Sequence, residues 1–209
     1  MIIINILDYE GDEFNSDTWL DVMYQKQLNV AIKYKDIEGL PQWPLSLDPK
    51  SSQVVFKDFL YRISEELSES YETEVDESTK VFDEDGTELH AIEELADALH
   101  FYLELLIYVG IKPERLKKWY SEYEYKEISV DKAYLMAQFR IGMSGQQLHN
   151  KPWKTDMIRT DVNKFVTCLK ELFFALLDVF RSQGASDEII FNRYTRKNKV
   201  NQFRQKSKY

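Results

Sequence analysis

Four acidic residues stand at spacings that suit a divalent metal ion. Glu66 and Glu69 are three positions apart, and Glu94 and Asp97 repeat that spacing. Helical residues three apart share a face, about 5–6 Å apart at Cβ, so both carboxylates of a pair can turn toward one ion. An all-oxygen donor set suits Mg²⁺ and is poor for zinc or copper. The two pairs therefore predict a magnesium site between two helices, with all four acids as metal ligands.

The second acidic pair lies within an apolar helix. Residues 87–110 read TELHAIEELADALHFYLELLIYVG, in which apolar residues recur at helical spacing. The predicted core-facing stripe consists of Leu89, Ile92, Leu95, Ala96, Leu99, Leu103, Leu106 and Ile107. A carboxylate beside such a stripe either loses its hydration at a cost or meets a cation. Glu94 and Asp97 accompany the stripe, whereas Glu93 is about 100° away from Glu94 and is expected to face solvent.

The alternative interpretation is that these acids are solvated and share a spacing by chance. Charged residues make up 30% of the chain, so such coincidences are common. Either pair alone favours this interpretation, and it is the second pair on the next predicted helix that supports a metal site. A pairing of Glu65 with Glu69, four positions apart, stays open.

Composition limits the class of protein. The chain has 209 residues, of which 44% are hydrophobic, enough for one folded domain with a sizeable core. Cys168 is the only cysteine, which excludes an intrachain disulfide and a cysteine-rich zinc site. The N-terminal MIIINIL is too short for a membrane span and lacks the basic lead of a signal peptide, and no later run is longer. We therefore expect a cytoplasmic protein.

Charge is distributed unevenly along the chain. The net charge is −9, yet residues 191–209 carry seven Lys or Arg and no acid. Residues 65–97 carry fourteen acids and only one Lys. This asymmetry predicts that the acidic middle and the basic tail contact each other or share a ligand of metal and phosphate. Overall acidity disfavours nucleic-acid binding, for which the tail would be the only candidate.

The basic tail presents cations and amides together. Residues at steps of three or four share one helical face there: Lys197, Asn198, Asn201, Arg204 and Gln205. Cations suit a polyphosphate, and amides suit the hydrogen-bonding edge of a base. Gln25 and Asn29 offer two further amides, four positions apart on an earlier helix. For these amides, and for the tail, the alternative is an ordinary solvated helix surface.

The remaining periodicity predicts a compact all-α bundle, a single domain over residues 1–209. Residues 1–15 are expected to be an irregular leader, and 186–209 a basic substrate-binding segment. Helices are predicted over about 18–35, 52–74, 87–110, 113–123, 130–142, 155–183 and 186–205. Proline-rich residues 37–50, and residues 75–86, are predicted to be loops. Ser16 or Asp17 is expected to cap the first helix.

These motifs together resemble the dimeric all-α dUTPase and dCTPase–dUTPase branch of the MazG-like nucleoside triphosphate pyrophosphohydrolases. Glu94 and Asp97 run into His100-Phe101, as in the ELxDxxHF motif of that branch. The family's YxxKNxxNxxRQxxGY tail is matched at Tyr194, Lys197, Asn198, Asn201, Arg204, Gln205 and Tyr209. Its QxxLN pattern is matched at Gln25, Leu28 and Asn29. The chain departs from the family at Lys208, where a glycine is usual, and lacks the FxWK segment that supplies a tryptophan to the base pocket, so Tyr71 or Trp43 is expected to substitute.

The resemblance implies Mg²⁺-dependent hydrolysis of a deoxynucleoside triphosphate, dUTP or dCTP, to a monophosphate and pyrophosphate, by a homodimer without membrane or nucleic acid as partner. It implies that the four acids Glu66, Glu69, Glu94 and Asp97 are also the catalytic residues, and that Glu66 orients or deprotonates the attacking water. Lys197 and Arg204 would neutralise phosphates, and Gln25, Asn29 and Asn201 would read the pyrimidine edge. Amides can turn to suit uracil or cytosine, so dUTP, dCTP and a broader range of triphosphates stay open. Rivals of another class are a non-catalytic interaction protein and a nucleic-acid binder.

Overall fold

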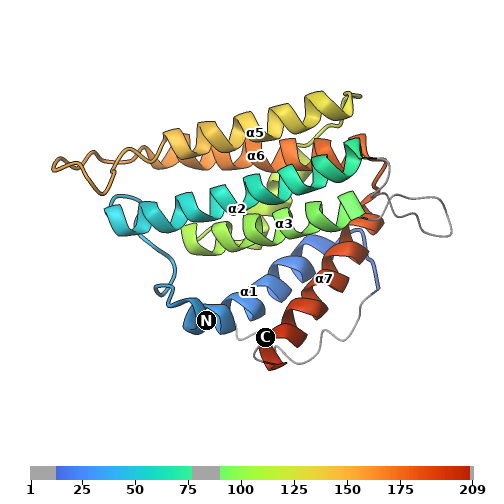
Figure 1. Cartoon of the computed structure of the whole chain (residues 1–209), viewed down its shortest axis with the longest axis horizontal. Helices are drawn as coiled ribbons and strands as arrows, with labels where there is room; N and C mark the ends of the chain where they lie inside the picture. Colours follow the sequence, from blue (N-terminus) through green and yellow to red (C-terminus); the bar gives the residue numbers. More distant parts are fainter. Residues whose placement is uncertain (1–12, 77–89, 208–209) are drawn as a thin grey trace.

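The chain folds as a bundle of helices (Figure 1). The computed structural model describes residues 13–76 and 90–207, and for residues 204–207 it describes the backbone alone. The helices are α1 (Trp19–Glu38), α2 (Lys50–Val75), α3 (His90–Val109), α4 (Pro113–Ser121), α5 (Val130–Gln146), α6 (Val162–Ser182) and α7 (Asp187–Ser207). No strand occurs in these residues. The predicted all-α fold is confirmed, whereas most of the expected 1–15 leader and of the 75–86 loop lies outside the described residues.

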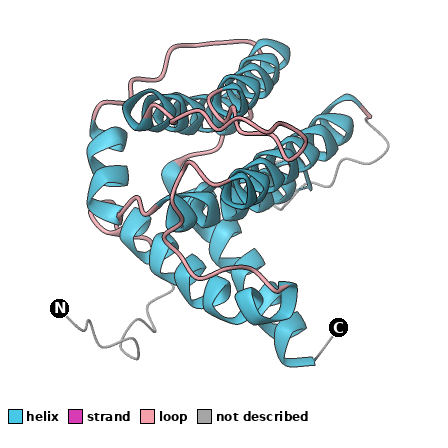
Figure 2. Ribbon diagram, turned by 90° about the vertical axis from the view of Figure 1, so that its left-hand side faces the viewer, coloured by secondary structure: helices cyan, strands magenta, loops and turns pink. Residues whose placement is uncertain are grey.

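The helices pair along their lengths. In Figures 1 and 2, α5 lies beside α6, α2 beside α3, and α1 beside α7, with the α2–α3 pair between the other two. The central helix α3 contacts α1, α2, α6 and α7. Within the described ranges, no helix has both the length and the apolar character needed to cross a bilayer.

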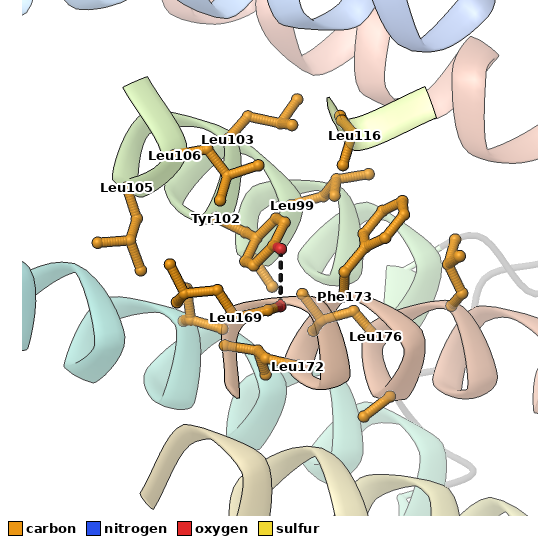
Figure 3. Packing of buried hydrophobic residues seen from close by; sticks show 14 of the residues in the cluster. Leu99, Tyr102, Leu103, Leu105, Leu106, Leu116, Leu169, Leu172, Phe173 and Leu176 are labelled. Carbon is orange, nitrogen blue, oxygen red and sulfur yellow. Dashed lines mark hydrogen bonds between the residues drawn. The ribbon is translucent and has the colours of Figure 1, made fainter. Parts of the chain in front are cut away.

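The central helix α3 carries the main core. Of the predicted stripe, all members from Ile92 to Ile107 are buried, and Leu89 lies outside the described residues. Figure 3 shows Tyr102 pointing from α3 to α6, where its hydroxyl donates a hydrogen bond to the Leu169 carbonyl at 2.8 Å. The Tyr102 ring also stacks on Phe173 at a centroid distance of 5.8 Å. These contacts fix the rotation of α3, and with it the direction in which its carboxylates point.

The sixth helix begins later than predicted, at Val162 instead of about residue 155. The reason lies in the preceding loop: the Asn150 side chain bonds both the N–H and the carbonyl of Ile158, eight positions later, at 2.6 and 2.7 Å. These bonds hold the preceding backbone outside the helix, and Asp161 caps it by accepting from the Lys164 N–H at 3.0 Å. Ile158 and Val162, both expected on the apolar stripe, are therefore exposed.

Smaller boundary differences have local causes. The first helix starts after Thr18, which makes no capping bond, so neither Ser16 nor Asp17 is the N-cap. It continues to Glu38, into the predicted 37–50 loop, and ends at Gly39 in the left-handed conformation. Helix α5 continues through Gly142 to Gln146 because burial of residues such as Ile141 against α6 outweighs the glycine cost of about 1 kcal/mol.

Candidate active site

Three of the four predicted acids converge between α2 and α3. Glu66, Glu94 and Asp97 each place one carboxylate oxygen so that the three oxygens lie within 4.8 Å of one another. All three side chains are half-buried. Glu69 is exposed and lies outside this trio, although its charge is close enough to act on Glu66 and Glu94. The trio has the donor atoms and spacing that a hard divalent cation requires.

Mutual repulsion makes the carboxylate trio costly without a cation. Burial, followed by the negative charges of Asp97, Glu69 and Glu94, raises the pKa of Glu66 to about 8. Burial also raises the pKa of Glu94, against the opposing effect of Lys197. Carboxyls that hold protons this firmly would release them to a divalent ion in their midst. The residues present therefore fit Mg²⁺.

Lys197 of α7 contacts the carboxylate trio. Its ammonium lies 2.8 Å from Asp97 Oδ2 and 3.9 Å from Glu94 Oε2. Burial alone would lower the pKa of Lys197, but the hydrogen bond to Asp97 and the charges of Asp97 and Glu94 raise it overall. Glu93, which the sequence predicts to face solvent, also contacts α7. Its Oε1 lies 3.8 Å from Arg193 Nη1 and 3.6 Å from Arg196 Nη1. The predicted contact between acidic middle and basic tail is thus present.

A cavity of about 240 Å³ opens beside the carboxylates. It is lined by Gln27, Val30, Tyr34 and Glu38 of α1, Arg62 and Glu66 of α2, Asp97, His100, Phe101 and Glu104 of α3, and Asn201 of α7. Glu66 and Asp97 belong to both the trio and the cavity wall. Glu104 is seven residues beyond Asp97, which places it two helical turns, about 10 Å, farther along. The cavity thus joins an acidic end, at the carboxylate trio, to a separate polar end.

His100 forms part of the cavity wall as a neutral imidazole. Its Nδ1 lies 2.7 Å from the Ala96 carbonyl and therefore carries the proton. Burial lowers the pKa of His100 to about 4. Its ring stacks on Tyr194 at a centroid distance of 3.9 Å. Nε2 is buried and has no hydrogen-bond partner among the described residues, so it offers a lone pair.

Of the substrate-binding residues predicted on the tail, the structure describes some side chains in the cavity wall and others in the interior. Asn201 lines the cavity. Asn198 is fully buried, and its Oδ1 accepts from Gln202 Nε2 at 2.7 Å. The side chains of Arg204 and Gln205, and the whole of Tyr209, lie outside what the structure describes.

The amides predicted on α1 do not line this cavity. Gln25 and Asn29 are half-buried, with Gln25 Nε2 3.4 Å from Asn29 Oδ1. The α1 amide in the cavity wall is Gln27, which is 1% exposed. Two residues along a helix correspond to a rotation of about 200°, which puts Gln27 on a different face from Gln25.

The aromatic residues expected to replace the missing tryptophan are also elsewhere. Trp43 packs edge-on against Tyr108 at 5.4 Å, and the Tyr71 hydroxyl bonds Asp131 at 3.0 Å. Neither is in the wall of the cavity in the described part of the chain. Its aromatic residues are Tyr34 and Phe101, beside His100.

An all-α bundle with three converging carboxylates at one end of a polar cavity has the architecture of a nucleotide hydrolase. A family model described as dUTPase matches residues 22–209, and the chain belongs to this family of all-α dUTPases, consistent with the wider MazG-like group. Membership makes the chain a dUTP diphosphatase-like hydrolase. No curated protein and no solved structure matched the chain significantly.

Proposed function

We propose that the chain hydrolyses dUTP to dUMP and pyrophosphate with Mg²⁺ held by Glu66, Glu94 and Asp97. The observation that carries this proposal is the approach of three carboxylate oxygens within 4.8 Å of one another at the end of a cavity. Glu69, on the exposed side of the trio, is proposed as a further ligand, directly or through water. A cytoplasmic deoxynucleotide pool is the proposed setting.

Each residue of the site has a proposed role in hydrolysis. A bound divalent ion would supply charge neutralisation at the phosphates and a more acidic water. Burial and neighbouring charges raise the proton affinity of Glu66. In its ionised form, Glu66 is therefore proposed to accept the proton of the attacking water. Phe101, Asn201 and Gln27 are proposed to surround the base, and Asn198 to support α7 from the interior. Arg204, Gln205 and Tyr209 remain proposed substrate-binding residues of the tail.

A panel of deoxynucleoside triphosphates tests this function. Pyrophosphate release is measured for dUTP, dCTP, dTTP, dATP and dGTP, with Mg²⁺ and with chelator. The expected result is Mg²⁺-dependent release with a pyrimidine preference and a monophosphate product. Release of inorganic phosphate instead would show cleavage at the γ-phosphate and contradict the proposed reaction. No release from any substrate would leave the non-catalytic interaction protein as the better account.

Lys197 is proposed to exchange its carboxylate partners for substrate phosphates. A metal ion held by the trio would compete with the Lys197 ammonium, which lies 2.8 Å from Asp97, and would repel it by its like charge. Lys197→Gln is expected to lower kcat/KM by about 10–100-fold, because a charge-assisted hydrogen bond is worth about 1.5–3 kcal/mol. Steady-state kinetics on dUTP provide the measurement. Lys199→Gln, the same charge change on an exposed residue of the same helix, is the matched control and should stay within about twofold of wild type.

The proposed homodimer requires an exposed apolar surface. The apolar stripe of α6 does not provide one, because it is buried within the chain itself. Helix α5 instead exposes Leu135 at 68% and Phe139 at 53%. We therefore propose association through the outer face of α5, and expect light scattering to give twice the chain mass. A monomer mass at working concentrations would contradict it.

A further inference from the structure

The polar end of the cavity contains a buried carboxyl that hydrolysis does not use. Glu104 of α3 is only 6% exposed and lines the cavity. Its Oε2 accepts a hydrogen bond from Gln27 Nε2 at 3.0 Å. No described residue donates to its other oxygen, Oε1. One oxygen is thus anchored to α1, while the second remains available for a ligand in the cavity.

Gln27, which anchors Glu104, has its own side-chain orientation fixed by Tyr194. The Tyr194 hydroxyl lies 3.0 Å from Gln27 Oε1 and 3.1 Å from the Met23 carbonyl. This contact assigns the Gln27 oxygen to the tyrosine side and its NH₂ to the carboxyl side. Tyr194 also stacks on His100, so one residue of α7 fixes two walls of the cavity. Glu104 is therefore positioned, and its Oε1 direction is set before any ligand arrives.

The surroundings of Glu104 allow it both protonation states. Burial is the largest influence, followed by the negative charge of Glu38 on α1, and both favour the acid. The charge of Arg62 on α2 and the hydrogen bond from Gln27 favour the carboxylate. The resulting pKa is about 7. The remaining groups that Glu104 acts on, Tyr108 of α3 and Tyr194 of α7, have raised pKa values and stay neutral in this range.

A carboxyl group can match either pyrimidine at position 4 by gaining or losing a proton. Cytosine has an amino group there, which donates, and carboxylates accept from this group in nucleic-acid recognition. Uracil has a carbonyl there, which accepts, and a protonated carboxyl can donate to it. The two bases therefore require opposite forms of the same side chain, and a mismatch would leave a buried polar group unpaired, which weakens binding.

We propose that Glu104 is the specificity-determining residue of the base pocket, accepting from the amino group of cytosine as a carboxylate and donating to the carbonyl of uracil as an acid. The preference between dCTP and dUTP then changes with pH. This inference rests on the proposed function, since it places the pyrimidine at the polar end of the cavity and the phosphates at the carboxylate trio.

The test is the ratio of kcat/KM for dCTP to that for dUTP between pH 6 and 8.5. Ionisations of the metal ligands and of Lys197 affect both substrates and cancel in this ratio. The ratio is expected to rise with pH, by up to about tenfold per pH unit, until it reaches a plateau. Glu104→Gln should make the ratio independent of pH, because an amide can turn either its oxygen or its nitrogen to the base.

Glu38→Gln is the matched control. It removes a nearby negative charge that favours the acid form of Glu104, and leaves the Glu104 carboxyl in place. The ratio should still depend on pH, with its rise displaced to lower pH. A flat ratio in this control would contradict the proposal, because the carboxyl would then not be the reader.

A measurement without turnover covers the case in which Glu104→Gln does not fold. Calorimetry of dUMP and dCMP binding to the wild-type protein, in buffers of different ionisation enthalpy at pH 7, reports protons taken up or released. Binding of dUMP should take up more protons than binding of dCMP. Pyrophosphate release with a ratio that is constant across pH, or equal proton uptake for both ligands, would overturn the role of Glu104 alone. Absence of turnover and of monophosphate binding would overturn the proposed function as well.

Discussion

Asp97→Asn is expected to lower the turnover of dUTP by about 10³-fold while the protein stays folded. The substitution keeps the shape of the side chain and removes its charge from a trio whose oxygens lie within 4.8 Å of one another. Loss of one charged ligand weakens metal binding and charge stabilisation of the reacting phosphate, effects worth several kcal/mol, and about 4 kcal/mol corresponds to 10³-fold in rate. The measurement is pyrophosphate release at saturating Mg²⁺ and dUTP, with circular dichroism to confirm folding.

Glu93→Gln provides the comparison for Asp97→Asn. It neutralises an acid on the same helix that faces Arg193 and Arg196 and is not part of the trio. Its turnover should stay near that of wild type. If Asp97→Asn retained wild-type turnover, or if Glu93→Gln lost as much, the trio would not be the catalytic centre. Isothermal titration with Mg²⁺ should show weakened binding in Asp97→Asn alone.

The convergence of Glu66, Glu94 and Asp97 could be predicted because its determinants are local. The three-residue spacing of Glu94 and Asp97 and the apolar stripe beside them fix their direction on α3 from helix geometry alone. Glu66 could be predicted for the same reason, since Ile63 and Leu67 orient α2. Glu69 lies at the outer edge of the same helix face, where the rotation of α2 against α3 decides whether it reaches the trio.

The polar end of the cavity depends on packing between distant segments. Nothing local distinguishes Gln25 from Gln27, because the deciding contacts of Gln27 come from Glu104 and Tyr194, 77 and 167 positions away. Glu104 did carry a signal: it is the only acid in the apolar run from Phe101 to Ile111. A lone carboxylate in such a run, on the same face as Asp97 two turns earlier, indicates a buried polar site.

The metal-free protein is expected to lose stability as pH rises from 6 to 8.5. The pKa of Glu66 is raised from an ordinary 4.5 to about 8 in the fold, so the folded state binds the proton more tightly than the unfolded state. The free energy of unfolding therefore decreases as pH rises through this window and is lowest above pH 8. Allowing for the partial solvation of the trio, the contribution is about 1–3 kcal/mol.

Glu66→Gln isolates the contribution of Glu66 to this pH dependence. The raised pKa values of Glu94 and Glu104 also lower stability as pH rises, but both groups remain in the variant. In urea unfolding with chelator, the variant should be more stable than wild type at pH 8.5 and should lose less stability between pH 6 and 8.5. Glu65→Gln, an exposed neighbour on α2, should keep the wild-type slope. Mg²⁺ at pH 8.5 should stabilise wild type more than Glu66→Gln, because only wild type keeps all three carboxylates. The free energy of unfolding could instead change equally with pH in wild type and Glu66→Gln. That result would mean that the carboxylates do not repel one another in solution. The physical argument for a cation between α2 and α3 would then be wrong.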